Sequence, residues 1–138
     1  MKQTFDTDLA LFDVLKDSAE LTSALTGGVY VQGERPDNSV LEDVVINTIT
    51  LSQEPDPQKG VSNVNIHVPD IDVVIRGVSQ KKADRARLKA LTTLVLSVLS
   101  AAKITGLLYW VTSQTVIKEP DLAQHFVNLR IEWNIHNN

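Results

Sequence analysis

Histidines, paired aspartates and a basic run are the side chains of this sequence that could do chemistry. His67, His125 and His136 lie far apart, and none has the HxH or HExxH spacing that directs two imidazoles at one metal ion. We interpret each as a surface histidine. Asp70 and Asp72 lack the enclosing loop of oxygen ligands that a hard cation needs, so we interpret them as turn residues.

Motifs for nucleophiles and cofactors are also missing. The chain contains no cysteine, which excludes thiolate catalysis, disulfides and cysteine-ligated metals. It has no GxSxG motif, and Gly27-Gly28 is followed by neither GxGxxG nor GK[ST]. We therefore predict a protein that is not an enzyme, without catalytic, cofactor-binding or metal-binding residues. The glycine pair is interpreted as the C-cap of a short helix.

Basic residues gather between Arg76 and Lys89, although the whole chain has a formal net charge of −4. Arg85 and Lys89 are one helical turn apart and could bind phosphates. No aromatic residue interleaves them and no nucleic-acid-binding motif accompanies them, so nucleic acid is the less favoured partner. A solvated helix start, or a patch for an acidic neighbour such as the loops around Glu34 and Glu42-Asp43, is favoured.

The hydrophobic pattern predicts the elements that position these residues. A helix is expected over residues 7–16, with Asp6 or Thr7 as its N-cap and a stripe of Leu9, Phe12 and Leu15. Leu11 and Val14 fall beyond this stripe and are candidate interface residues. A second short helix is expected from Asp17 or Ser18 to Leu25.

A long helix is predicted from Asp84 to about Lys103, because apolar residues recur there at helical spacing. Its far side carries Thr93, Ser97 and Ser100, which are small and uncharged. Solvated helix faces usually carry Lys and Glu, so this face indicates packing within the subunit or between subunits. An exposed, weakly polar face is the alternative.

Strands are expected at residues 29–33, 43–51 and 62–68, at the segment after Gly106, and at Val127–Ile135, with loops at 34–39 and 53–60. In the last strand the odd positions are apolar, which predicts burial. Its even positions include Asn128, Arg130 and Glu132, which we expect on an open sheet face available to a neighbour. Residues 70–83 leave two alternatives, a further strand or an excursion before the long helix.

These elements predict a single α+β domain over residues 1–138. We expect a mainly antiparallel sheet of four to five strands, with the N-terminal helix pair and the long helix packed on one face. The N-terminus has no apolar segment of signal-peptide length, and no window is apolar enough to span a membrane. The expected location is therefore a reducing cytosol, without a membrane partner.

The order of these segments resembles a known family. A helix pair ends in GG and is followed by VYVQGERP, DVVINTITL, a proline-containing loop and SNVNIHVPDI; a helix then opens with ADRARLKAL before two long strands. Over nearly the whole chain this is similar to the small tail-completion proteins of long-tailed phages and prophages, the tail-terminator-like or head–tail joining family. The excursion Val73–Lys82 is longer than the family's usual link.

The resemblance implies a structural virion assembly protein without catalytic residues. Such proteins form a homo-oligomeric ring, commonly hexameric, that closes the tail-tube end and joins it to the head connector. The implied partners are the chain itself, the tail-tube protein and the head connector proteins, in the host cytoplasm during assembly and then in the tail or neck of the virion. The alternative is a small α+β binding or regulatory domain that uses the stretch Arg76–Lys89 for an acidic partner or nucleic acid.

Overall fold

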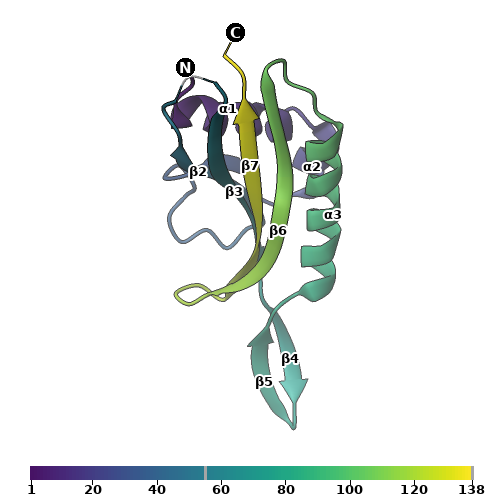
Figure 1. The fold of residues 1–138 in the computed structure, drawn as a ribbon. Helices are drawn as coiled ribbons and strands as arrows, with labels where there is room; N and C mark the ends of the chain where they lie inside the picture. The colour runs from purple at the N-terminus through teal and green to yellow at the C-terminus, as the bar shows by residue number, and fades with distance from the viewer. Residues whose placement is uncertain (55, 138) are drawn as a thin grey trace.

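Helices and a mixed sheet form two layers in the computed structural model, which describes residues 1–54 and 56–137 (Figure 1). The predicted α+β class is confirmed. In chain order, the elements are α1 (Thr4–Lys16), α2 (Ala19–Ala24), β1 (Val29–Val31), β2 (Asp43–Leu51), β3 (Gln58–Pro69), β4 (Ile71–Ile75), β5 (Val78–Lys82), α3 (Arg85–Ala101), β6 (Leu107–Glu119) and β7 (Gln124–Ile135).

Within the described residues, the main sheet has five strands in the order β1-β2-β3-β7-β6. Strand β1 runs parallel to β2, and every other neighbouring pair is antiparallel. The helices lie on one face of this sheet (Figure 1). Strand β7 lies between β3 and the edge strand β6, and its odd positions are buried as predicted: Val127, Leu129, Ile131, Trp133 and Ile135.

Helix α1 begins earlier and faces the sheet differently than predicted. Its N-cap is Gln3 rather than Asp6 or Thr7, and the Asp6 carboxylate accepts a hydrogen bond from the Gln3 backbone. Leu11 is fully buried in the core, so its prediction as an interface residue is wrong. The apolar arc is too wide to be buried entirely, and its middle faces the sheet, which leaves Leu9 exposed and Val14 partly buried.

The glycine pair has a different role from the predicted C-cap. Helix α2 begins at the predicted N-cap Ser18, but it ends at Leu25 in extended backbone, and neither glycine has a positive φ. Gly27 instead lies against the start of β2. A Cβ atom there would lie 2.6 Å from the carbonyl oxygen of Glu42 and would overlap the Asp43 carboxylate. Close backbone approach therefore requires glycine at this position.

A chain of hydrogen bonds crosses the core beneath α1. The hydroxyls of Thr7 and Thr48 lie 2.7 Å apart, and Thr48 bonds in turn to Ser62 Oγ at 2.7 Å. The Trp133 indole N–H donates to the same Ser62 oxygen at 2.7 Å. These bonds join α1, β2, β3 and β7, and they satisfy polar groups that would be costly to bury alone.

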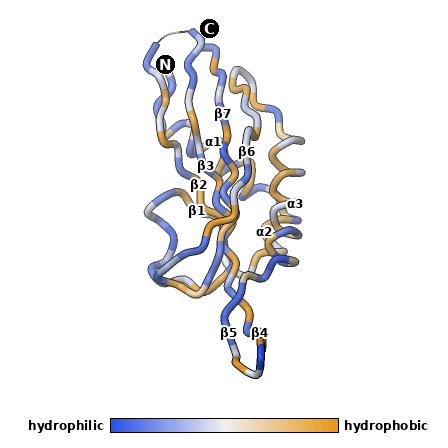
Figure 2. The backbone as a smooth tube through the Cα atoms, turned by 60° about the horizontal axis from the view of Figure 1, so that its bottom comes forward, coloured by the Kyte–Doolittle hydropathy of each residue, from blue (hydrophilic) through white to orange (hydrophobic). Residues whose placement is uncertain are grey.

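Both alternatives for residues 70–83 hold in part: β4 is a further strand, and with β5 it forms a separate hairpin, an excursion before α3. Arg76 and Gly77 form its two-residue turn, and both have positive φ (52° and 79°), as a type I′ turn requires. The hairpin projects beyond the body of the molecule (Figure 1 and Figure 2). The loop predicted for 53–60 is shorter, because β3 already begins at Gln58; Pro55 lies outside the described residues.

Among the described residues, no helix combines the length and apolar character needed to cross a membrane.

Candidate functional site

The predicted face of α3 forms one continuous exposed stripe. Its members are spaced three or four residues apart and all point to solvent: Arg85, Lys89, Thr93, Ser97 and Ser100. The prediction that this face packs within its own subunit is therefore wrong. Contact with another subunit stays a prediction.

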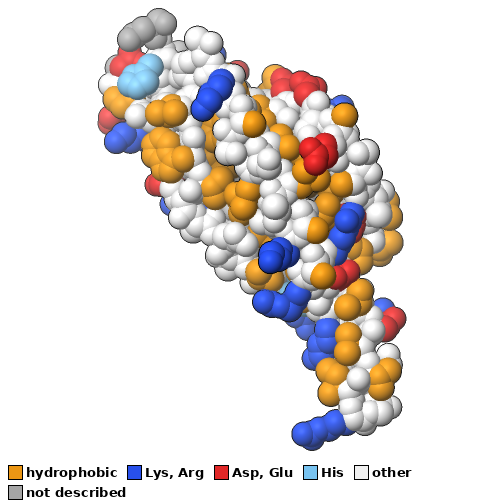
Figure 3. Space-filling model, turned by 90° about the vertical axis from the view of Figure 1, so that its right-hand side faces the viewer, with side chains coloured by type: hydrophobic (Ala, Val, Ile, Leu, Met, Phe, Trp, Pro, Cys, Tyr) orange, Lys and Arg blue, Asp and Glu red, His pale blue; other side chains and the backbone are white. Residues whose placement is uncertain are grey.

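A groove in two sections runs between this stripe and β6. The section near the start of α3 has a volume of about 630 Å³ and is lined by Arg85, Lys89, Thr92, Gln114 and Val116, among others. The second section, of about 610 Å³, lies between Ser97 and Trp110. Both share Thr93 and Leu96. Figure 3 looks onto this side, where apolar side chains lie among uncharged ones and basic side chains gather towards the hairpin.

Strand β6 forms the long free edge of the sheet. It pairs with β7 on one side, and within the described residues no strand pairs with its other side. Leu108, Trp110, Val116 and Ile117 along it are exposed. Long apolar edge strands invite pairing with another chain, and proteins normally shield them. The uninterrupted apolar run LLYWV was the sequence signal for this surface, which our list of candidate residues missed.

The hairpin β4–β5 is a second exposed apolar element. Ile71, Val74, Ile75 and Val78 are all exposed, and the hairpin's substantial contacts are between its own two strands. An isolated two-stranded hairpin is only marginally stable in water. A contact with another molecule would therefore stabilise it.

The basic stretch does not form a single patch. Arg76 lies at the hairpin tip, and Lys81 pairs with Asp72 at 3.0 Å. Arg87 binds Glu42 through two bonds of 2.6 and 2.9 Å, and it also donates to the carbonyl of Ala24. The hydrogen bond from Arg87 to the Glu42 carboxylate holds the pKa of Glu42 below its usual value, although burial acts to raise that pKa. Arg85 and Lys89 remain exposed one turn apart on α3, so the phosphate-binding alternative stays a prediction.

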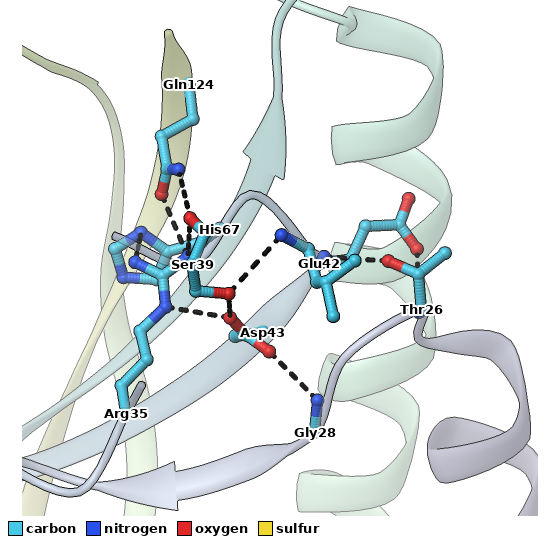
Figure 4. Close-up of polar contacts among 9 residues, drawn as sticks. Thr26, Gly28, Arg35, Ser39, Glu42, Asp43, His67 and Gln124 are labelled. Carbon is cyan, nitrogen blue, oxygen red and sulfur yellow. Dashed lines mark hydrogen bonds and ion pairs between the residues drawn. The ribbon is translucent and has the colours of Figure 1, made fainter. Parts of the chain in front are cut away.

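A buried polar cluster anchors the loop between β1 and β2 (Figure 4). Arg35 Nε donates to Asp43 Oδ2 at 2.8 Å, and its Nη2 donates to Gln124 Oε1 at 2.9 Å. Asp43 also accepts bonds from Ser39 Oγ and the Gly28 backbone. Our placement of Glu42 and Asp43 in an acidic surface loop is therefore wrong, since both carboxylates are buried opposite arginines.

Two of the histidines also depart from the surface interpretation. His67 is buried beside Arg35, with its Nδ1 3.3 Å from Arg35 Nη1. His125 Nδ1 lies 2.6 Å from Asp70 Oδ1, and this carboxylate is almost fully buried rather than being a plain turn residue. The pair ties the root of the β4–β5 hairpin to the start of β7. His136 is exposed as predicted.

Burial, with the nearby Arg35 charge, lowers the pKa of His67 to about 4. In the unfolded chain, His67 takes up a proton near the ordinary histidine pKa of about 6.5. The neutral His67 side chain therefore makes its full contribution to the free energy of unfolding above about pH 6.5. That contribution is lost as the pH falls towards 4. We expect the free energy of unfolding to fall by about 2 kcal/mol between about pH 7.5 and about pH 5.

Urea unfolding at the two pH values measures this effect. The His67→Gln variant is the control, because it removes the titrating group and should flatten the profile between them. An equal pH dependence in both proteins would contradict the assignment to His67.

The polar side of β7 lies on the sheet face opposite the helices, as predicted. Arg130 is exposed and Glu132 half-buried, while Asn128 donates to Asn65 Oδ1 on β3 at 2.7 Å. Asn128 therefore contributes to the sheet itself. No group of acidic and histidine side chains suited to a metal ion occurs among residues 1–54 and 56–137.

No protein-family model matches the chain, and no curated protein is significantly similar to it. The resemblance to tail-completion proteins stays a prediction. The features that bear on function are therefore the exposed ones, namely the α3 stripe, the groove, the free edge of β6 and the projecting hairpin.

Proposed function

We propose that this protein is a structural virion assembly protein of a long-tailed phage or prophage and not an enzyme. Copies of the chain form a ring, commonly hexameric in the family it resembles, that closes the end of the tail tube and joins it to the head connector. The protein assembles in the host cytoplasm and then forms part of the tail or neck of the virion.

The observation that carries this proposal is the apolar surface along the groove and β6. Val116 is exposed on the groove side of β6, whereas Leu108 and Trp110 are exposed on the other face of the same edge strand, where they pair with Asn134 and Glu132. The α3 stripe across the groove is mostly small and uncharged. Exposed apolar side chains along a free sheet edge mark a site for contact with another chain. A contact between unlike surfaces of identical subunits closes into a ring when the rotation fits.

The buried charge pairs support a scaffold rather than an active site. Arg35 and Arg87 both hold carboxylates inside the chain's own structure, and the described residues carry no cluster suited to a metal. The remaining exposed features, the edge strand and the hairpin, suit contacts with other protein chains.

The Ser97→Glu substitution tests the role of the α3 stripe. Ser97 is exposed, so the monomer should keep its free energy of unfolding within about 0.5 kcal/mol. In an assembled ring the new carboxylate would be buried without a partner, and assembly should weaken by about tenfold or more. Native mass spectrometry across a concentration series measures the assembly of the wild type and of the Ser97→Glu protein.

Ser23→Glu is the matched control, because Ser23 is an exposed serine on α2, away from the groove. It should leave assembly unchanged. A wild-type chain that stays monomeric at high concentration, and that is not recruited to tail-tube ends, would overturn the proposed function.

A further inference from the structure

The groove section at the start of α3 combines charge with apolar surface. Arg85 and Lys89 are exposed at its rim, while Leu96, Val116 and Val127 contribute apolar walls. Its volume of about 630 Å³ lies within the range typical of ligand-binding pockets. An occupant that fits must be apolar and must also carry negative charge.

The outer face of α1 has the complementary character. Phe5 is 77% exposed and Leu9 is 55% exposed, one turn apart on the side of the helix that faces away from the sheet. Asp6 and Asp13 are exposed along one flank of these two side chains, and Lys16 is exposed on the same face, over the Phe12 ring. Two carboxylates against one cation, beside exposed apolar side chains, suit a groove whose rim carries Arg85 and Lys89.

We propose that the groove between α3 and β6 binds the outer face of α1 from a second copy of this chain. Phe5 and Leu9 enter the apolar part beside Leu96 and Val116, and Asp13 faces Lys89. The two surfaces are unlike and lie on different helices, so the contact is head-to-tail and continues from copy to copy. This inference rests on the proposed function, for which it names the contact between subunits.

Cysteine cross-linking tests the contact directly, because the natural chain contains no cysteine. Purified Leu9→Cys and Thr93→Cys proteins, mixed and oxidised, should give a disulfide-linked heterodimer, identified by peptide mass spectrometry. The control mixture of Gln32→Cys with Thr93→Cys should give at least about tenfold less product, since a disulfide requires Cα atoms within about 7 Å. Dominant Leu9→Cys homodimers would overturn the proposal, because they indicate a contact between like surfaces.

Charge exchange provides the second test. Lys89→Glu should weaken association by about tenfold, and adding Asp13→Lys to the same chain should restore it to within about threefold of wild type. Both residues are exposed, so the monomer should remain folded in circular dichroism. Rescue is the expected result, and a simple structural defect would not produce it.

The outcomes separate the two proposals. A wild type that assembles, but without the Leu9→Cys to Thr93→Cys cross-link and without rescue, overturns this contact and leaves the ring intact. Occupation of the groove by the β4–β5 hairpin of a neighbour would appear as cross-linking of Val74→Cys with Thr93→Cys, and would also overturn it. A wild type that does not assemble under any condition overturns both.

Discussion

A chain that ends before Leu129 is expected not to fold. The deletion removes four fully or almost fully buried side chains, Leu129, Ile131, Trp133 and Ile135. Each contributes about 1.5–3 kcal/mol, and the sum is comparable to or above the total stability of about 5–15 kcal/mol that is usual for a domain. Because β7 lies between β3 and β6, the deletion also leaves β6 largely unpaired and opens one edge of β3, which stays paired with β2.

Replacement of the β4–β5 hairpin, residues 71–82, by a short glycine linker is the matched control. Ile71 and Lys82 are paired, so their ends lie close enough to be joined, and the hairpin's substantial contacts are between its own strands. Thermal unfolding followed by circular dichroism should show a cooperative transition for this variant and none for the truncated chain. A truncated chain that unfolds cooperatively at the wild-type temperature would contradict a core role for β7.

Arg35→Ala should cost about 3–5 kcal/mol, because it leaves a buried carboxylate without its ion-pair partner. Asp43 is 1% exposed, and Arg35 also donates to Gln124 from the same guanidinium. The loop between β1 and β2 would lose its anchor to the sheet at the same time. Urea unfolding at neutral pH measures the loss.

Lys81→Ala is the control for this effect. It breaks the Lys81–Asp72 pair, whose side chains are 56% and 66% exposed, and such surface pairs contribute about 0–1 kcal/mol. If Arg35→Ala costs no more than Lys81→Ala, the buried cluster does not stabilise the fold as the geometry indicates.

Regular hydrophobic periods allowed the main elements to be predicted. The alternation of Val127, Leu129 and Ile131 identified a half-buried strand, and the three-to-four spacing from Leu88 identified the long helix α3. Both signals are local, because the period depends only on the chain's own geometry. The orientation of α1 was harder, since a wide apolar arc does not say which part of it faces the sheet.

Buried polar contacts were not predictable from the sequence. Glu42 reads as part of an acidic loop, yet its partner Arg87 is 45 residues away in the chain. His67 reads as the polar position of an alternating strand, but the loop carrying Arg35 covers it. The turn Arg76-Gly77 was a hairpin signal that could have been recognised, because a glycine at the second turn position suits a type I′ turn.

The position of β7 also constrains the order in which the sheet assembles. Strands β6 and β7 are joined by a short turn and can pair early. Strands β3 and β7 are far apart in the sequence, as the pair Asn65 and Asn128 shows, so their pairing closes a long loop. In the part of the chain that the structure describes, β6 pairs with the main sheet only through β7, so the C-terminal hairpin must dock as a unit onto β3. We expect this non-local step to limit the folding rate, and until it is complete the edges of β3 and β7 are open to pairing with other chains.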